Sequence, residues 1–471
     1  MKATSKTLAR IHKVRRRALG GKRAMGWDYQ ARGRRVRRPD PHRIRLGKPD
    51  GTLTGVAGLA LFGVFLRRLG LDRILNSFND LKPGSRVVYP MGAQLRLLLD
   101  AAAVGEPRVF GIEALGSDPL FVHLAGGSVP SVDTLYRDLC RVHELDLAKL
   151  ELVMADQGLA EVRALRRDRV HLDVDTTVEP LFGHQEGALP GPNPRYHGRP
   201  SYHPLLGVVA ESQTCIGAVL RAGDRGFGGT DAASVRTYVD RVRSAVGPAT
   251  DVVVRIDAGG DCAEFFEEIS AAGAHFLVKA RLTADLLGAV MHHTRWTTVD
   301  SDADGRPLRQ VAEIDFSRTE WQQRGLHVRV VAVRSLDRDV GKQVFLWSDL
   351  EYTTHIILTN DFGRTLDDVA RDYDGRAEVE TIIAELKGAL GIGKVPSQIF
   401  DANHTAFLIK LLAHNVLRRY ARHIAAPPTW RLPWIRRALF LVPGRLVRSG
   451  RQWTLRLPPR SPLLLASARL Q

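Results

Sequence analysis

The sequence predicts an α/β fold in which a core of alternating strands and helices follows a mostly helical region. Three changes of pattern support this prediction. Apolar residues recur at helical spacing over residues 52–166, whereas from Val170 apolar and polar residues alternate, as in a strand. Strand-like and helix-like segments then follow one another up to position 279, which is typical of an α/β core. Residues 281–360 hold mainly strand-like runs, which predict a β-rich insertion.

The helical region begins with two apolar segments, residues 53–66 and 91–103, and each is expected to form a buried helix. A further helix is expected to start after Pro130, because Ser131 or Asp133 can serve as its N-cap.

Arg137 and Arg141 are candidate DNA-binding residues on this last helix. They are four residues apart and therefore share one face of a helix. A short helix after the Gly-Gly-Ser turn at residues 126–128 resembles the second helix of a helix-turn-helix. An ordinary surface helix gives the same pattern, so both interpretations stay open.

In the core, the pattern predicts strands at residues 170–175, 205–210, 215–220, 251–256 and 275–279, and helices at 232–246 and 262–272. Insertion strands are expected at residues 310–316, 326–333, 344–346 and 356–358, and long helices at 366–390 and 402–422. The chain then divides into a basic arm, the helical region, a first core segment, the insertion, a second core segment and a basic tail, with bounds 1–50, 51–166, 167–280, 281–360, 361–425 and 426–471.

The formal charge of +17 is concentrated at the two ends of the chain. Residues 1–50 hold 17 Lys or Arg and 3 acidic residues, and residues 418–471 hold 12 Arg and no acidic residue. The whole chain has 68 basic and 51 acidic residues, so residues 51–417 hold 39 basic and 48 acidic residues and are net acidic. Basic ends attract DNA or an anionic membrane surface. We expect the arm to be disordered until bound, although a solubility tail has the same composition.

Trp430, Trp434 and Trp453 alternate with arginines in the tail. Aromatic rings among cations can stack on nucleic-acid bases. They can equally anchor the tail against a neighbouring subunit, and the sequence leaves both roles open.

Composition disfavours several classes of protein. A hydrophobic share of 44% is sufficient for sizeable cores, which argues against global disorder. The longest apolar run, residues 55–66, is shorter than the ~20 residues that span a bilayer. Cys140, Cys215 and Cys262 form no CxxC pair, so neither a zinc site nor a disulfide framework is predicted. We therefore expect a protein of the reducing cytoplasm without a membrane segment.

Two aspartates stand at the ends of predicted core strands. Asp175 ends the first of these strands, and Asp257 directly follows the fourth. Ligands of α/β sheets gather at the carboxyl ends of strands, so both carboxylates are candidates for chemistry. Asp173 points to the same strand face as Asp175 and is an alternative or additional ligand. Asp261 is a rival to Asp257 but is better explained as a cap of the helix that follows it.

A third carboxylate, Glu380, lies on the predicted helix at 366–390 together with Tyr373, Arg376 and Lys387. At roughly 100° per residue, these four side chains fall within an arc of about 60°. Cations on this face can hold phosphates, while the carboxylate can hold a metal. Two strand-end aspartates and a helix glutamate are oxygen ligands suited to Mg²⁺-dependent phosphoryl transfer. The alternative is an ordinary helix pair between Arg376 and Glu380.

These residues resemble the DDE transposases of bacterial insertion sequences, in the group marked by a Tyr-x2-Arg-x3-Glu-x6-Lys signature. The signature stands here at positions 373, 376, 380 and 387, and the group's first two catalytic carboxylates match Asp175, within Asp-Thr-Thr, and Asp257. Residues 198–206 and the Ala-His-Asn at 413–415 also look like one branch of the group. The resemblance covers roughly residues 50–460. It departs at Gly260, where the group often has an aromatic residue.

The resemblance implies an RNase H-like catalytic core interrupted by the β-rich insertion. It implies that Asp175, Asp257 and Glu380 bind two Mg²⁺ or Mn²⁺ ions. The enzyme would then cut a phosphodiester at a transposon end and transfer the freed 3′-hydroxyl into target DNA.

Tyr373, Arg376 and Lys387 are expected, on the same resemblance, to contact DNA phosphates near the cleaved end. The implied partners are double-stranded DNA, as terminal inverted repeats and as target, and a second copy of the chain in a homodimer acting at a bacterial nucleoid. A catalytically inactive DNA-binding regulator and an endonuclease without strand transfer are the alternatives.

Overall fold

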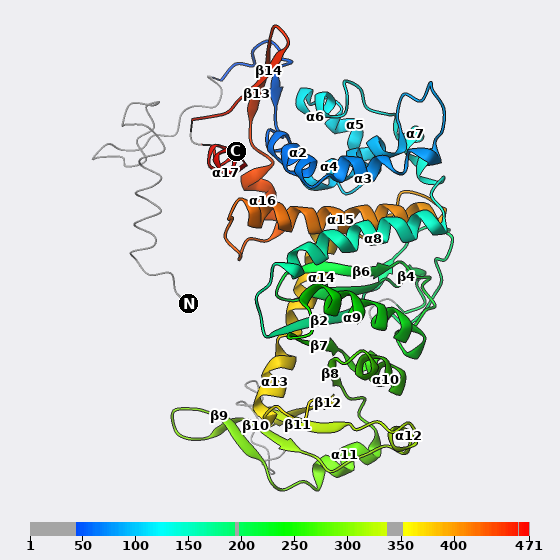
Figure 1. Cartoon of the computed structure of the whole chain (residues 1–471), viewed down its shortest axis with the longest axis vertical. Helices are drawn as coiled ribbons and strands as arrows, with labels where there is room; N and C mark the ends of the chain where they lie inside the picture. The colour runs from blue at the N-terminus through cyan, green and yellow to red at the C-terminus, as the bar shows by residue number, and fades with distance from the viewer. Residues whose placement is uncertain (1–43, 194–196, 337–351, 460, 471) are drawn as a thin grey trace, which may run out of the picture.

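The computed structural model describes residues 44–193, 197–336, 352–459 and 461–470. A mixed sheet of nine strands runs from the middle of the molecule to one end, with helices packed against it and the first helices of the chain at the other end (Figure 1). The strand order is β6 (Thr214–Val219), β5 (Leu205–Val209), β2 (Arg169–Thr176), β7 (Asp251–Ile256), β8 (His275–Lys279), β12 (Tyr352–Thr359), β11 (Arg329–Leu336), β10 (Pro307–Glu313) and β9 (Thr297–Ser301). β2, β7 and β8 run parallel, whereas the other neighbours pair antiparallel. The predicted α/β fold class is confirmed.

The two faces of β2 differ because side chains alternate along a strand. Its apolar positions join a buried cluster with α9 (Ala232–Val246) and α10 (Ala263–Ala271), and they are Val170, Leu172 and Val174. Its polar positions face α13 (Leu366–Asp374) and α14 (Ala377–Ala389), and they are His171, Asp173 and Asp175. The alternation read from the sequence therefore places the acidic residues on one face.

The strands of residues 281–360 extend the central sheet. β12 pairs antiparallel with β8, with Leu358 opposite Val278, and β11, β10 and β9 follow outward. Two helices, α11 (Ala284–Met291) and α12 (Thr319–Gln323), belong to the same segment. The strand expected at 344–346 lies outside the described residues. Because β12 adjoins β8, the inserted segment flanks the strand ends where Asp175 and Asp257 lie.

Helices from distant parts of the chain pack together beyond β6. α8 (Glu144–Arg163), which the sequence pattern did not predict, lies beside α15 (Phe400–His423) (Figure 1). One apolar cluster joins α15 and β6 to the shorter helices of the first part of the chain. These are α2 (Gly58–Arg68), α3 (Leu71–Asn76), α4 (Met91–Val104), α5 (Ile112–Leu115), α6 (Pro119–Leu124) and α7 (Val132–Leu139).

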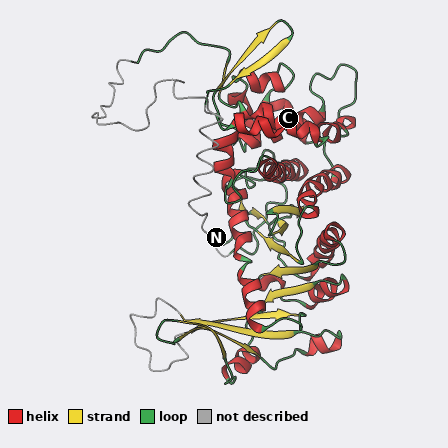
Figure 2. Ribbon diagram, turned by 60° about the vertical axis from the view of Figure 1, so that its left-hand side comes forward, coloured by secondary structure: helices red, strands yellow, loops and turns green. Residues whose placement is uncertain are grey.

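The C-terminal segment packs onto these helices. α16 (Leu432–Leu439) buries one face there, and the hairpin of β13 (Gly444–Ser449) and β14 (Gln452–Arg456) pairs with β1 (Leu53–Thr54) and projects from one end of the molecule (Figure 2). α17 (Leu463–Leu470) closes the chain. The rings of Trp453 and His123 have centroids 4.6 Å apart, so this tryptophan is anchored on its own chain. The predicted basic arm falls almost entirely outside the described residues. In the part of the chain that the structure describes, no helix is long and apolar enough to span a membrane.

β6 is an edge strand whose free backbone groups are satisfied by helix side chains. The Asn415 side chain accepts from the Cys215 N–H at 2.9 Å and donates to the carbonyls of Cys215 and Met154, each at 2.8 Å. A ring nitrogen of His414 lies 2.8 Å from the Gln213 carbonyl. Unpaired edges invite association with other chains. His414 and Asn415, which only the family resemblance had marked, therefore protect this edge.

Asn415→Ala is expected to lower the free energy of unfolding by about 3 kcal/mol, because buried backbone groups of β6 and α8 lose their partner. Urea denaturation followed by circular dichroism measures this loss. The control is Gln398→Ala at an exposed position, for which a change within about 0.5 kcal/mol is expected. Equal unfolding midpoints for the two variants would contradict the structural role of Asn415.

Candidate active site

Asp175, Asp257 and Glu380 line one cavity of about 590 Å³ at the carboxyl ends of β2 and β7. These two strands are adjacent and parallel, so their ends meet at one edge of the sheet, while Glu380 comes from α14. The other lining residues are Ala258, Lys279, Thr353, Thr354, His355, Tyr373, Asp374, Arg376 and Ala377. The tertiary structure thus gathers the three predicted carboxylates in one place.

Asp257 and its rival Asp261 have different surroundings. The Asp257 Oδ1 accepts a hydrogen bond from the Gly259 N–H at 2.8 Å, and its side chain lines the cavity. Asp261 forms a bidentate ion pair with Arg318, at 2.6 and 2.8 Å. Its expected role as a helix cap is wrong, because the N-cap of α10 is Cys262. Asp257 is the strand-end carboxylate that remains accessible to a ligand.

Asp173 is held by Arg255 even though it shares a strand face with Asp175. The guanidinium lies 2.6 Å from Oδ1 through Nε and 2.8 Å from Oδ2 through Nη2. Both side chains are buried, at 0% and 3% exposure. Asp173 is fully buried and does not line the cavity, whereas Asp175 does, so Asp175 is the candidate ligand on β2.

The Tyr-Arg-Glu-Lys signature does not lie on one unbroken helix, and that expectation is wrong. α13 and α14 are separated by a turn at Gly375 and Arg376. Tyr373, Arg376 and Glu380 still line the cavity. Lys387 does not line the cavity. Its Nζ donates to the Val178 carbonyl at 2.9 Å and lies 3.3 Å from Oε1 of Glu179.

Arg255 causes this break in the helix. Its Nη1 donates to the Asp372 carbonyl at 2.8 Å, and in a continuous helix that carbonyl would accept the Arg376 N–H. The Arg376 N–H bonds instead to the Tyr373 carbonyl at 2.9 Å. Gly375 makes room for the guanidinium, because a Cβ there would lie 2.4 Å from Nη1 of Arg255. One buried arginine thus satisfies Asp173 and re-aims the start of α14.

Arg376 bridges two of the three carboxylates. Its Nη2 lies 2.9 Å from Oδ2 of Asp175, and its Nη1 lies 3.3 Å from Oε1 of Glu380. Burial raises the pKa of Asp175 to about 6, Arg376 opposes this shift, and the Asp257 carboxylate adds to it. The cavity therefore concentrates negative charge, and Arg376 is the cation that offsets it.

The donor set suits a hard divalent cation, because Mg²⁺ and Mn²⁺ prefer carboxylate oxygens. The carboxylates of Asp175 and Asp257 repel each other, and a divalent cation between them would relieve this repulsion. In the part of the chain that the structure describes, no three His, Cys, Asp or Glu side chains are close enough together to hold a metal ion. The three carboxylates thus match a divalent cation in donor chemistry and charge but not in spacing, because Arg376 lies between Asp175 and Glu380.

Lys279 and His355 line the cavity but were absent from the predicted site. Lys279 ends β8, the third parallel strand, so its position at a strand end was a usable signal. His355 is supplied by β12, and burial lowers its pKa. Nothing in the spacing of the sequence brings His355 to Asp175, because only the pairing of β12 with β8 does so.

Arg137 and Arg141 are both exposed but do not share a helix face. α7 contains Arg137 and ends before Arg141, whose Nε donates to the buried Asp138 at 3.0 Å. Ser131 is the N-cap of α7, as predicted, and its Oγ accepts from the Thr134 N–H. Neither arginine lines the cavity of the carboxylates.

His171, on the polar face of β2, provides a pH-dependent contribution to stability. Burial lowers its pKa, but the carboxylates of Asp372 and Glu211 outweigh burial and raise it above the ordinary value near 6.5. Its Nδ1 lies 2.7 Å from Oε1 of Glu211. A raised pKa in the folded state stabilises the protein below pH 6.5, and this stabilisation is lost as the pH rises through the folded pKa.

His171→Gln is therefore expected to cost more free energy of unfolding at about pH 6 than at about pH 8.5. Urea denaturation of both proteins at the two pH values measures the difference. In the control, His327→Gln at an exposed position, the change should be the same at both pH values. A pH-independent effect of His171→Gln would rule out the charged histidine.

Comparisons with known proteins identify relatives of this chain. A family model described as transposase DDE domain group 1 matches residues 38–467, which include all three carboxylates. Among solved structures, the piggyBac transposase in a synaptic complex with hairpin DNA, determined by cryo-EM, is similar with a TM-score of 0.42 and 10% identity. The match covers 81% of this chain and 78% of that one. No curated protein sequence matches.

Proposed function

Because this chain belongs to the transposase DDE domain group 1 family, we propose that it is a metal-dependent transposase that cuts DNA at transposon ends and joins them to target DNA. Asp175, Asp257 and Glu380 are its catalytic carboxylates. The observation that carries this proposal is the single cavity in which these three residues meet Arg376 and Tyr373.

The reaction has two steps. Water adds to the phosphorus of a phosphodiester at the transposon end, and the P–O3′ bond breaks to release a 3′-hydroxyl. That hydroxyl then attacks a phosphodiester of target DNA and displaces another 3′-oxygen, so one bond forms for each that breaks. Asp175, Asp257 and Glu380 would hold two Mg²⁺ or Mn²⁺ ions, which when bound would activate the attacking oxygen and stabilise the leaving oxygen.

We assign the part of the sheet from β6 to β8 to the RNase H-like class, with residues 281–360 as its insertion. This assignment is supported by two aspartates at the ends of neighbouring parallel strands and a glutamate on a helix packed over the same face. Thr353, Thr354 and His355 of the insertion line the cavity, which supports a role of the insertion in holding DNA there.

The remaining signature residues bind DNA phosphates. Arg376 is buried at the cavity floor, where its guanidinium can pair with a phosphate oxygen once its carboxylate partners turn to the metal. Burial raises the pKa of Tyr373 to about 12, so its phenol stays neutral and can donate. Lys387 lies further along α14, beside Glu179, and reaches a phosphate away from the scissile one.

The partners of this activity are the terminal inverted repeats and the target DNA. Residues 51–166 contact the duplex through exposed Arg137 and Arg141, and the two basic ends contact it as well. The net positive charge of the two ends supports their part in this binding. A homodimer holds two ends together. The element is a bacterial insertion sequence, and the protein acts at the nucleoid.

An assay with labelled end DNA, target DNA and the purified chain tests this function. We expect nicking and joined products with Mg²⁺ and neither product with EDTA. Cleavage without joined product would favour the endonuclease alternative. Specific binding to end DNA without cleavage in Mg²⁺ or Mn²⁺ would favour the inactive regulator.

A further inference from the structure

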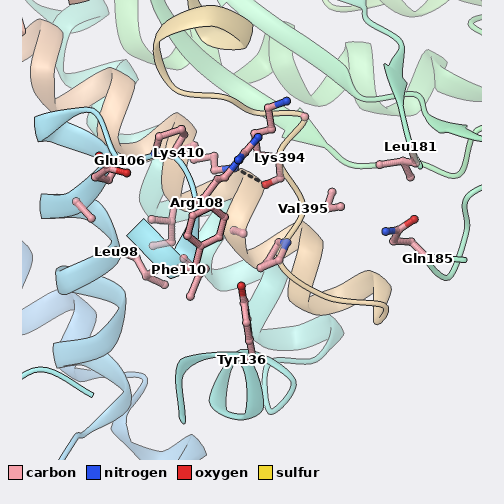
Figure 3. Close-up of a pocket in the computed structure, with 18 of the residues that line it drawn as sticks. Leu98, Glu106, Arg108, Phe110, Tyr136, Leu181, Gln185, Lys394, Val395 and Lys410 are labelled. Carbon is pink, nitrogen blue, oxygen red and sulfur yellow. Dashed lines mark hydrogen bonds between the residues drawn. The ribbon is translucent and has the colours of Figure 1, made fainter. Parts of the chain in front are cut away.

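A second cavity, of about 450 Å³, lies where the first helices meet the sheet and α15 (Figure 3). Its walls come from α4 and the loop after it, α7, the loop after β3 (Glu179–Pro180), the loop that leads into α15, and α15 itself. It shares no lining residue with the cavity of the three carboxylates. Its size is in the range of small-molecule sites, so its chemistry indicates what it can hold.

Cations outnumber carboxylates in this second cavity. Arg108, Lys394 and Lys410 line it against a single Glu106. Within the described ranges, Arg108 and Lys394 form no ion pair. Lys410 is buried, and its Nζ donates to the Gly391 carbonyl at 2.7 Å. It also donates to the Lys394 carbonyl at 2.6 Å (Figure 3). The three cations outnumber the one carboxylate that lines the cavity, so an anion between them would relieve their mutual repulsion.

The surroundings of the Lys410 ammonium support an anion in this cavity. Burial above all, with smaller contributions from nearby Lys394 and Arg108, lowers the pKa of Lys410 to about 7 against the opposing effect of Glu179. An ammonium taken out of water is stabilised by a nearby negative charge. Even with Glu106 in the cavity and Glu179 near Lys410, cations remain in excess, so the cavity favours a further anion.

Two aromatic side chains stand beside these cations. Phe110 is a large apolar residue with 52% of its surface exposed, and the Arg108 Cζ lies 5.4 Å from its ring centroid. Tyr136 directs its hydroxyl into the cavity, and Leu98 and Val395 supply apolar wall (Figure 3). A ring and a guanidinium at an open apolar wall suit a base that carries a phosphate.

We propose that this cavity binds one nucleotide unit, with its phosphate on Arg108 and Lys394 and its base against Phe110 and Tyr136. The unit is either a free nucleotide or one nucleotide of a DNA strand. Lys387 lies beside Glu179, and the next residue, Pro180, lines the cavity. A strand that runs from the carboxylates past Lys387 therefore reaches this site, a link that rests on the proposed function, whereas nucleotide binding itself does not.

Titration of the full chain with thymidine 5′-monophosphate in EDTA, followed by calorimetry, tests the proposal. We expect saturable binding that Arg108→Ala and Lys394→Ala each weaken by about tenfold. Phe110→Ala should weaken the nucleotide but not inorganic phosphate, because it removes only the base contact. The matched control is Arg166→Ala, an exposed arginine outside the cavity, and thermal melting checks that each variant folds.

A second arm uses pentathymidylate to identify the source of the nucleotide. Tighter binding of the oligonucleotide than of the monophosphate, lost in the same variants, supports a DNA strand, and equal binding supports a free nucleotide. Absence of saturable binding of both probes, or wild-type affinity in the Arg108→Ala/Lys394→Ala double variant, overturns the proposal. Because no metal and no cleavage enter this assay, a chain that binds nucleotide but never cuts DNA fails only the proposed function.

Discussion

Asp175→Asn is expected to lower the rate of DNA cleavage by about a thousandfold, which corresponds to about 4 kcal/mol of lost transition-state stabilisation. The amide preserves the shape of the side chain but not the charge that attracts a divalent cation. Asp257→Asn and Glu380→Gln should act in the same direction, since the three carboxylates line one cavity. Single-turnover cleavage of labelled end DNA measures the rate.

In these variants we expect DNA cleavage to be lost while DNA binding is kept. Affinity for end DNA should remain within about threefold of wild type, because the basic surfaces that attract DNA are untouched. The matched control is Asp240→Asn, which removes one carboxylate of an exposed ion pair with Arg236 and should cleave at the wild-type rate. Cleavage by Asp175→Asn within tenfold of wild type would exclude it as a metal ligand.

Arg255→Met is expected to destabilise the fold by about 3–5 kcal/mol, because it leaves the Asp173 carboxylate buried without its partner. The same change frees the Asp372 carbonyl and removes the group that interrupts α13 and α14. Cleavage should therefore fall along with stability, since Arg376 would lose its orientation toward Asp175. Urea denaturation and the cleavage assay measure the two effects.

A double variant separates the charge effect from the packing effect. In Asp173→Val/Arg255→Met both charges are absent, so most of the lost stability should return, as replacement of buried ion pairs by apolar residues is often neutral. Cleavage should stay low in the double variant, because the Asp372 carbonyl still lacks its donor. If the double variant is as unstable as Arg255→Met, an unpaired buried charge is not the cause of the destabilisation.

Local pattern was sufficient for the strands and helices of the core from β2 to β8. The alternation at Val170 predicted β2, and the β-branched run before Asp257 predicted β7, because burial on both faces selects such residues. α8 was missed even though it buries Leu150 and Met154, since its polar and apolar residues are closely mixed. The interruption of the helix at Gly375 was missed because its cause, Arg255, is remote in sequence.

The sequence by itself determined the α/β class and the side of β2 on which Asp175 lies, and it predicted Asp175, Asp257 and Glu380 as the acidic site residues. The two aspartates follow from local rules, namely the period of two along a strand and the position of ligands at strand ends, whereas Glu380 follows from helical spacing and the family resemblance. Only the tertiary structure decided that Asp173 is occupied by Arg255, that Arg376 stands between Asp175 and Glu380, and that Lys387 lies apart. The physical reason is that a charged group takes the partner that folding brings within hydrogen-bond distance, and spacing along the chain does not encode that distance.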